Sequence, residues 1–345
     1  MRAAVFLGPK VIEIQEREKP YIKDDELLVK VKAAGICGTD VKIFNGEKKI
    51  EVPKIIGHEF SGEVFEVGNR VKDFVSGDRV AVEPIIPCGS CYSCKSDRFN
   101  LCLSRPTIGY EYDGGFADYV RIPSSAIKAG NVIKLSAEVS FEEGALAEPA
   151  AACINGNRKL RKQTDEILWI IGDGPIGLIH VQLAKNIGFK KIILSGENEA
   201  KLFLGKEFGA RFVINIRKEN VEKSLLELTD GNGVDQIIIA VNNIKVVIQA
   251  LPLLKKGGLL ILFAGFSPDS KVIMDLNLIH YREISIIGSS GHSARDLKEA
   301  VDLMKNKKLN LMPLITQRFA LYEITSGINL KKEQKGIKQI IEMER

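Results

Sequence analysis

A glycine-rich segment, Gly172-Asp173-Gly174-Pro175-Ile176-Gly177, constrains the fold of this chain more than any other feature. It directly follows the apolar run Ile167–Ile171 and opens a stretch with helical periodicity. Glycines at these positions let the backbone approach a pyrophosphate, and the N-terminus of the following helix faces its charge. A glycine-rich turn without a ligand is the alternative, but strand, turn and helix stand in the order that dinucleotide binding requires. The segment therefore predicts a cofactor site formed by Gly172, Gly174, Pro175, Ile176 and Gly177.

Strand-like and helical stretches alternate around this segment from about residue 141, which is the rhythm of a doubly wound parallel sheet. The first 130 residues instead contain short runs rich in Val and Ile, punctuated by Gly, Pro and Asp, as in β-rich domains. The tail predicts two helices, at 293–306 and 321–329, and a strand at 338–341. We therefore predict an α/β protein with a discontinuous β-rich domain (1–149 and 287–345) around a dinucleotide-binding domain (150–286).

Composition excludes several classes of protein. The 345 residues are 45% hydrophobic and 27% charged, as in globular proteins with real cores. The net charge of +5 is spread along the chain, which argues against nucleic-acid binding. The longest apolar runs, such as Leu259–Phe266, are too short to span a bilayer, and the N-terminus lacks a signal sequence. We expect a cytoplasmic protein with neither a nucleic-acid nor a membrane partner.

Four cysteines, Cys88, Cys91, Cys94 and Cys102, lie within fifteen residues with the spacing C-x2-C-x2-C-x7-C. Four thiolates at this density close a tetrahedron around Zn²⁺ and leave no position for a substrate. Disulfides or a thioredoxin-like redox pair are the alternatives, but no βαβ unit surrounds the motif and the compartment is expected to be reducing. The spacing predicts a structural zinc site.

A second set of possible zinc ligands is dispersed. Cys37, His58 and Glu59 lie in separate turns of the β-rich region. Together they offer ligands for a catalytic zinc with an open position, although spacing alone does not show it. A buried cysteine and a satisfied loop histidine are the alternatives.

The second strand of the dinucleotide domain ends in Gly196, where a carboxylate for the adenosine ribose is usual. Glu197 follows, either as that ribose ligand or as a solvated carboxylate near a helix N-terminus. Lys201, in the same helix, is placed with the cofactor-binding residues. Because no Arg follows Gly196 directly, NAD(H) is favoured, with NADP(H) still open.

Taken together, the segments resemble the zinc-dependent medium-chain alcohol dehydrogenases, in their sorbitol (L-iditol 2-dehydrogenase)-like branch. The resemblance covers essentially the whole chain. The segments that carry it, besides the cysteine run and the dinucleotide loop, are Gly35–Asp40, Gly57–Gly68, Gly77–Val80, Asp113–Ala117, Glu148-Pro149 and Ile279–Glu283.

The resemblance implies a GroES-like catalytic domain, a Rossmann cofactor domain and two zinc ions per chain. It implies that Cys37, His58 and Glu148 bind the catalytic zinc, with Glu59 behind the metal as a possible alternate ligand. Zinc then activates the hydroxyl of a polyol or secondary alcohol, a hydride passes to the nicotinamide, and Thr39 carries the proton away. A buried turn hydroxyl is the alternative for Thr39, and a helix-capping carboxylate is the alternative for Glu148. The family also implies a homodimer or homotetramer.

Other residues stay open at this stage. Lys42 stands where many relatives have a histidine that relays the proton; a surface lysine is the alternative. Phe44, Tyr110 and Phe116 are candidates for the substrate pocket or the core. His180 is expected on a helix surface, and His292 in a loop that borders the nicotinamide.

Two other functions compete with the zinc polyol dehydrogenase. A zinc-free medium-chain reductase of quinones or enones has the same fold, but it lacks the ligands that this chain keeps. A zinc-ribbon module for nucleic acid needs a basic, aromatic platform, which the residues flanking the cysteines are too few to form.

Overall fold

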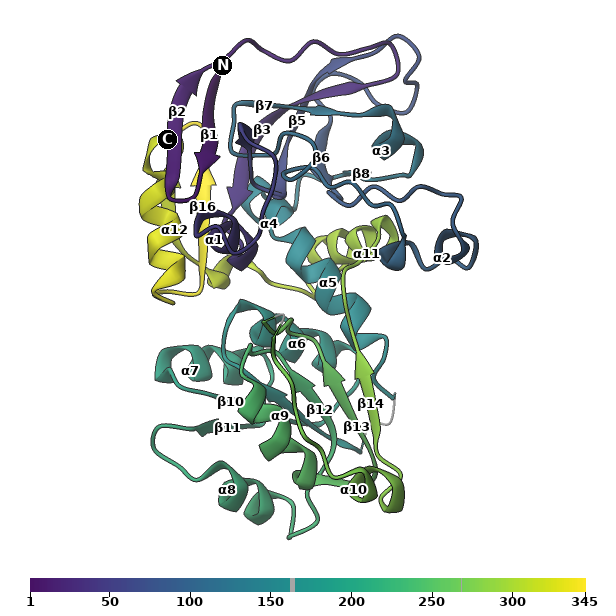
Figure 1. Cartoon of the computed structure of the whole chain (residues 1–345), viewed down its shortest axis with the longest axis vertical. Coiled ribbons are helices and arrows are strands. Elements are labelled where there is room, and N and C mark those ends of the chain that lie inside the picture. Colours follow the sequence, from purple (N-terminus) through teal and green to yellow (C-terminus); the bar gives the residue numbers. More distant parts are fainter. Residues whose placement is uncertain (162–164, 268) are drawn as a thin grey trace. The chain divides into compact units, whose positions relative to one another are not determined.

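The computed structural model describes residues 1–161, 165–267 and 269–345 (Figure 1), and the chain divides into two compact units. The first unit comprises Met1–Ala151 and His292–Arg345, and the second comprises Ala152–Gly291. Both contain β-sheets and helices, which confirms the predicted α/β class. No helix among the described residues has the length and apolar character needed to cross a membrane.

The first unit is built on a seven-stranded sheet in the order β15-β16-β3-β5-β6-β8, with β7 also paired to β3. A smaller sheet has the order β2-β1-β4. Arg2, at the start of β1, donates a hydrogen bond from Nη2 to the carbonyl of Met343 at 2.8 Å, so the two chain ends lie side by side (Figure 1). The strands are β1 (Arg2–Gly8), β2 (Val11–Glu16), β3 (Leu27–Gly35), β4 (Lys54–Ile55), β5 (Glu59–Val67), β6 (Arg79–Val82), β7 (Tyr119–Ile122), β8 (Val132–Lys134), β15 (Ile315–Ala320) and β16 (Lys338–Glu342).

The helices of this unit are mostly short. They are α1 (Gly38–Phe44), α2 (Tyr92–Lys95), α3 (Ser124–Lys128), α4 (Phe141–Ala145), α11 (Ala294–Lys305) and α12 (Ile324–Lys332), with α5 (Ala147–Asn157) continuing into the second unit. The apolar core includes Phe44 and Phe116, two of the three aromatic residues that were candidates for the substrate pocket. Tyr110, the third, packs against the edge of this core.

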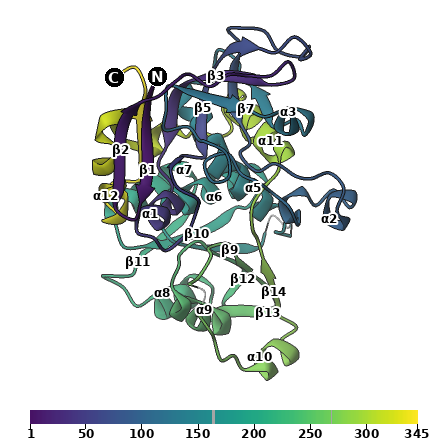
Figure 2. The same ribbon diagram turned by 45° about the horizontal axis from the view of Figure 1, so that its top comes forward.

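The second unit is a six-stranded parallel sheet in the order β11-β10-β9-β12-β13-β14. Helices α6 and α7 lie on one face and α8 and α9 on the other (Figure 2), as in a doubly wound fold. The strands are β9 (Ile167–Ile171), β10 (Lys191–Gly196), β11 (Phe212–Asn215), β12 (Val234–Ile239), β13 (Leu254–Leu262) and β14 (Ser285–Gly288). The helices are α6 (Pro175–Asn186), α7 (Glu199–Phe208), α8 (Val221–Leu228), α9 (Ile244–Ala250) and α10 (Leu276–Tyr281).

The prediction that His180 lies on a helix surface is wrong. The residues of α6 from Gly177 to Ala184 are all buried, so this helix has no solvent face along two turns. The His180 ring is stacked edge-on against Phe263, and its Nδ1 lies 2.6 Å from Nδ2 of Asn157. Burial without a charged partner lowers the pKa of His180 to about 3.

Strand register brings distant segments of the first unit to one place. In the antiparallel pair β3–β5, Gly35 stands opposite Glu59, and in the antiparallel pair β16–β3, Ile340 stands opposite the same glycine. The residues just after β3, just before β5 and at the start of β16 therefore share one end of the sheet.

Candidate metal centres and dinucleotide site

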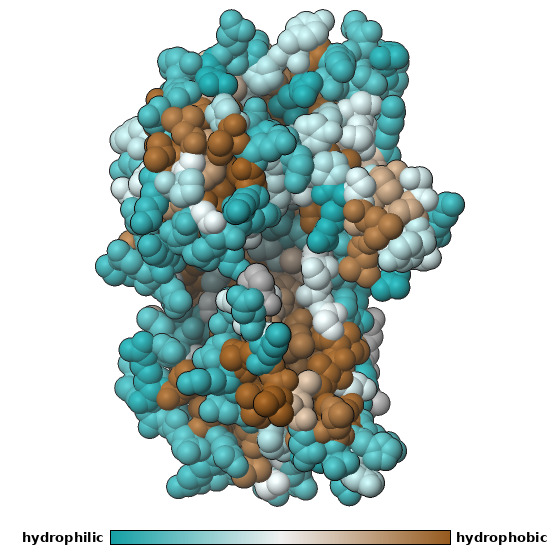
Figure 3. All heavy atoms as spheres, viewed as in Figure 1, coloured by the Kyte–Doolittle hydropathy of each residue, from teal (hydrophilic) through white to brown (hydrophobic). Residues whose placement is uncertain are grey.

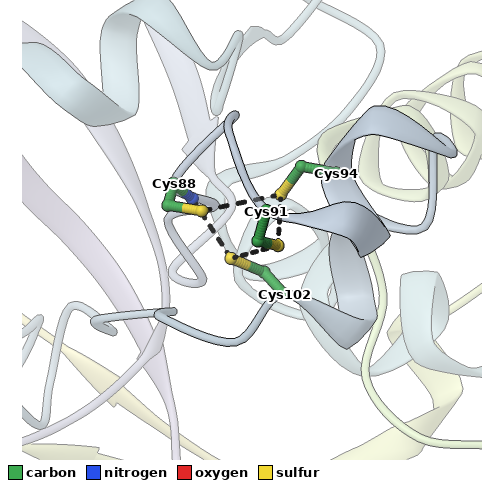
Figure 4. A group of neighbouring side chains, drawn as sticks. All are labelled: Cys88, Cys91, Cys94 and Cys102. Carbon is green, nitrogen blue, oxygen red and sulfur yellow. Dashed lines mark hydrogen bonds between the residues drawn. The ribbon is translucent and has the colours of Figure 1, made fainter.

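The four cysteine sulfurs of the Cys88–Cys102 segment converge on one point (Figure 4). The sulfur of Cys94 lies 4.0 Å from that of Cys88 and 3.6 Å from that of Cys91. The sulfur of Cys102 lies 3.9 Å from that of Cys91. A zinc ion bonded to four sulfurs at about 2.3 Å holds them about 3.8 Å apart, whereas a disulfide needs about 2.05 Å. The group therefore fits zinc and not a pair of disulfides.

Local backbone structure produces this convergence. Gly89 has a φ of +72°, which permits the sharp turn after Cys88, and Cys91 is the N-cap residue of α2. The 3₁₀ turn Phe99–Leu101 then returns the chain to Cys102. Backbone N–H groups of Ser90 and Cys91 lower the pKa of the Cys88 thiol to about 5, which favours the thiolate that a metal requires.

Cys37, His58 and Glu59 form a second group, in which one ligand atom from each lies within 4.8 Å of the others. Cys37 is the N-cap residue of α1, His58 stands just before β5, and Glu59 begins that strand. His58 and Glu59 are buried, and Cys37 is partly exposed. One thiolate, one imidazole and one carboxylate at this separation are a donor set that zinc accepts.

Two side chains lie beside Nδ1 of His58: Asp40, which the sequence did not single out, and Tyr110, a candidate for the substrate pocket or the core. Oδ1 of Asp40 lies 3.6 Å from Nδ1 of His58, and the hydroxyl of Tyr110 lies 3.3 Å from the same nitrogen. Asp40 is fully buried, and its Oδ1 has no hydrogen-bond partner among the described residues. A ring held at Nδ1 presents Nε2 to a metal, as in the carboxylate–histidine–zinc arrangement. Because Asp40 stands three residues after Cys37, the motif itself carried this signal.

Glu59 is paired with a buried lysine from a remote part of the chain. Nζ of Lys338, at the start of β16, donates to Oε2 of Glu59 and, at 3.1 Å, to the carbonyl oxygen of Ile36. Burial opposes both charges, but the pairing outweighs it: the pKa of Glu59 is lowered and that of Lys338 is raised. Glu59 is therefore a carboxylate that already forms an ion pair with the ammonium group of Lys338.

Glu148 lies outside the Cys37 group and faces a different partner. In the first turn of α5, its Oε1 lies 3.6 Å from Nε2 of His292, which lies 2.9 Å from Oε2 of Glu83. Both His292 and Glu83 are buried. Burial lowers the pKa of His292, but the two carboxylates outweigh it and raise the pKa to about 9. His292 is thus held between two glutamates.

The residues expected to move a proton lie near Cys37. Thr39 stands two residues after Cys37, in the first turn of α1, and its Oγ1 lies 3.7 Å from the sulfur of Cys37. Lys42, in the last turn of the same helix, is exposed. The hydroxyl of Thr39 therefore lies beside Cys37, and Lys42 has the position of a surface lysine.

The glycine loop connects β9 to α6 as predicted. Gly172 has a φ of +119°, and a Cβ on Gly177 would lie 1.8 Å from the carbonyl oxygen of Gly172, so both positions require glycine. Gly174 is the N-cap residue of α6, and a Cβ there would meet nothing within 4 Å. Open space at the N-terminus of a twelve-residue helix, which Pro175 and Ile176 begin, fits a pyrophosphate.

The end of β10 explains why the usual carboxylate is missing there. A Cβ on Gly196 would lie 2.3 Å from Cγ of Asp173, which comes from the glycine loop. Oδ2 of Asp173 accepts hydrogen bonds from the backbone N–H groups of Glu197 at 2.9 Å and Asn198 at 2.8 Å. Asn198 in turn caps α7 by accepting from the backbone N–H of Lys201 at 3.1 Å. Asp173 thus occupies the space that a side chain at 196 would need.

Glu197, the first carboxylate after β10, has a basic partner that the sequence did not reveal. Its Oε2 accepts hydrogen bonds from Arg217, at 2.6 Å from Nη2 and 3.1 Å from Nε. Arg217 stands two residues after β11, the strand next to β10. No arginine follows Gly196 directly, but the neighbouring strand supplies one.

Comparison with known proteins gives matches over nearly the whole chain. Residues 23–137 match the model of the alcohol dehydrogenase GroES-like domain, and residues 175–306 match that of the zinc-binding dehydrogenases. The chain is 36% identical over 327 residues to the D-arabitol-phosphate dehydrogenase of Enterococcus avium, covering 94% of this chain and 91% of that protein. It is 32% identical over 330 residues to the sorbitol dehydrogenase of Bacillus subtilis, covering 93% and 90%.

A solved zinc-binding dehydrogenase from Sinorhizobium meliloti, bound to NADP, superposes with a TM-score of 0.93 at 30% identity, covering 99% of this chain and 98% of that one. The four cysteines lie inside the matched GroES-like domain, so they are part of that domain. The predicted family and fold are confirmed: this chain belongs to the zinc-binding dehydrogenases that carry an alcohol dehydrogenase GroES-like domain.

Proposed function

We propose that this protein is a zinc-dependent dehydrogenase that transfers a hydride between a polyol, free or phosphorylated, and a nicotinamide cofactor. The observation that carries the proposal is the group of Cys37, His58 and a carboxylate, with the carboxylate of Asp40 3.6 Å from Nδ1 of His58. The relatives named for sorbitol and for D-arabitol phosphate support the substrate class.

Cys37, His58 and Glu148 are the proposed ligands of the catalytic zinc. One thiolate and one carboxylate balance the charge of Zn²⁺, and the imidazole completes a three-ligand site with an open position. We prefer Glu148 to Glu59 because the buried ammonium of Lys338 already engages Glu59. Glu148 faces only a more distant cation, 3.6 Å away at His292. Glu59 is then a counter-charge behind the metal.

The chain's own residues supply the positioning and the proton path. Zinc bound at this group supplies a Lewis acid, which lowers the pKa of a substrate hydroxyl. Thr39 accepts the proton of that hydroxyl on Oγ1 and passes it toward solvent, because its hydroxyl lies beside the ligand sulfur of Cys37. Asp40 and Tyr110 keep the His58 ring fixed while charge develops at the reacting oxygen. A nicotinamide cofactor, when bound, would supply the hydride acceptor.

Cys88, Cys91, Cys94 and Cys102 are the proposed ligands of a structural zinc, because four sulfurs close the coordination shell. For the cofactor we propose that the backbone around Gly172, Gly174, Pro175, Ile176 and Gly177 holds the pyrophosphate. Glu197, together with the first turn of α7 at Lys201, meets the adenosine ribose.

We further propose a homo-oligomer, built from a dimer in which two copies pair through β14. This strand is at the edge of the six-stranded sheet, and Ile273, Leu276, Tyr281 and Ile287 are exposed there or on the adjoining segment. Figure 3 shows apolar side chains gathered over α9, β13 and β14. A second copy covers an open, apolar edge of this kind by an isologous contact. Light scattering tests this: two or four chain masses agree with it, and one does not.

A cytoplasmic location completes the proposal, since six cysteines, four of them at metal-site spacing, suit a reducing compartment.

The experiment that tests the function is a substrate panel. Sorbitol, arabitol, galactitol, their monophosphates, 2,3-butanediol and L-threonine are each supplied with NAD⁺ or NADP⁺, and reduced cofactor is followed by absorbance. A kcat/KM for a polyol or polyol phosphate at least ten times that for butanediol or threonine supports the proposal. A preference for either of those two compounds contradicts the substrate class.

A further inference from the structure

The surface at the ends of β10 and β11 carries two opposed pairs of charges. Glu197 and Glu199 follow β10, and Arg217 and Lys218 follow β11. Arg217 is paired with Glu197, and Lys218 is paired with Glu199. All four side chains are more than half exposed. They belong to one unit and stand on adjacent parallel strands, so their placement depends on local register alone.

The adenosine ribose of a dinucleotide on the glycine loop reaches this surface. In a doubly wound sheet the pyrophosphate lies at the loop after the first strand, here β9, and the ribose lies over the end of the neighbouring strand, here β10. Asp173 occupies the space of a side chain at Gly196, and its Oδ2 already accepts hydrogen bonds from two backbone N–H groups. Glu197 is therefore the carboxylate left to accept a bond from a ribose 2′-hydroxyl.

Arg217 supplies the cationic side chain that binds a 2′-phosphate. Its guanidinium approaches Glu197 through both Nε and Nη2, the edge that also binds a phosphate through two parallel bonds. An exposed ion pair contributes at most about 1 kcal/mol, so a phosphate exchanges for the carboxylate at little cost. The backbone of Arg217 is anchored, because its N–H donates a hydrogen bond to Oδ1 of the buried Asn215 at 3.0 Å.

We propose that the Glu197–Arg217 pair sets cofactor choice and makes this enzyme accept both NAD(H) and NADP(H). With NAD(H), Glu197 keeps Arg217 and also accepts the 2′-hydroxyl. With NADP(H), Arg217 leaves Glu197 and binds the 2′-phosphate. This rests on the proposed function only in requiring that a nicotinamide dinucleotide binds at the glycine loop.

Binding measurements test the pair without relying on turnover. NADH and NADPH are titrated into the zinc-loaded protein and the dissociation constants are read from cofactor fluorescence; 2′,5′-ADP, which carries the phosphate without nicotinamide, is titrated by calorimetry. For the wild type we expect constants for NADH and NADPH within about tenfold of each other. In Arg217→Ala we expect NADPH and 2′,5′-ADP to bind about tenfold or more weakly, because a bidentate charge-assisted contact is lost. NADH should stay within threefold.

Two further variants complete the test. Glu197→Gln should weaken NADH and strengthen NADPH, because a carboxylate that repels the 2′-phosphate becomes neutral. Lys218→Ala is the matched control: it removes an equally exposed cation one residue away and should change NADPH binding less than threefold.

Several results overturn the proposal. They are a wild type that binds NADPH more than tenfold more weakly than NADH, an Arg217→Ala variant with unchanged NADPH binding, and a Lys218→Ala variant with an equal loss. If neither cofactor binds the wild type, the proposed function fails as well; if NADH binds normally and only the Arg217 effect is missing, this inference alone fails.

Discussion

Oδ1 of Asp40 lies 3.6 Å from Nδ1 of His58, and both side chains are buried. Asp40 stands three residues after the proposed ligand Cys37. The same carboxylate, through Oδ2, accepts the backbone N–H of Cys37 at 2.8 Å. From the first turn of α1, Asp40 therefore lies against both proposed ligands, hydrogen-bonded to the backbone of Cys37 and within ion-pair distance of His58.

Asp40→Asn should loosen the catalytic zinc and leave the structural zinc in place. The amide keeps the shape of the side chain but loses the charge that orients His58, and such changes cost about 10–100-fold in metal affinity. We expect dialysis against a chelator to bring the variant to one zinc per chain at concentrations that leave the wild type with two. Metal analysis by mass spectrometry measures this, and equal chelator resistance of the two proteins would show that Asp40 does not act on the metal.

Cys94→Ser should lower the melting temperature while the folded fraction keeps one zinc. Removing one of four sulfurs opens the structural site, whose binding energy is folding energy. Cys153→Ala is the control, because Cys153 is a buried cysteine in the second unit, outside both metal groups. A fully stable but inactive Cys94→Ser would mean that the two sites are assigned in reverse.

His180 should make the second unit less stable in acid. Its folded pKa, about 3, lies below the ordinary value of 6.5, so between these values the unfolded chain binds a proton that the folded chain does not. Stability is therefore complete above pH 6.5 and falls as pH drops, by about 2 kcal/mol at pH 5 relative to pH 7.

Urea unfolding followed by the fluorescence of Trp169 measures this effect, because Trp169 is the only tryptophan and is buried in β9 of the same unit. In His180→Gln, which does not titrate, the loss between pH 7 and pH 5 should be smaller by about the same 2 kcal/mol. Identical pH dependence in the two proteins would contradict a neutral buried histidine.

Glu148→Ala should reduce bound metal toward one zinc per chain and abolish turnover with every alcohol. A site reduced to Cys37 and His58 loses its geometry and its charge balance. If Glu148 only stabilises the first turn of α5, the variant loses about 1 kcal/mol of stability and keeps two zincs and nearly normal activity. A variant that keeps both zincs but is inactive would transfer the ligand role to Glu59.

The sequence predicted the features that residues close in the chain form, and it missed the contacts that residues distant in the chain form. The cysteine group, the glycine loop and the turn at Cys37 depend on residues close in the chain, and each stands in the structure near its predicted element. The pairs Lys338–Glu59, His292–Glu83 and Arg217–Glu197 join residues 279, 209 and 20 positions apart through tertiary contacts, which local patterns do not encode. His180 was misplaced because α6 is covered on all sides over two turns, so the period expected of a surface helix is absent.

Zinc content and polyol oxidation, followed together in one preparation, test whether the enzyme depends on a catalytic zinc. Purified protein should contain two zincs per chain. We expect graded chelation to remove the more labile zinc first, turnover to fall in proportion to it while the chain stays folded, and added Zn²⁺ to restore activity. Full polyol oxidation by protein that holds only one zinc, with that zinc on the four cysteines, would contradict a catalytic zinc at Cys37, His58 and Glu148.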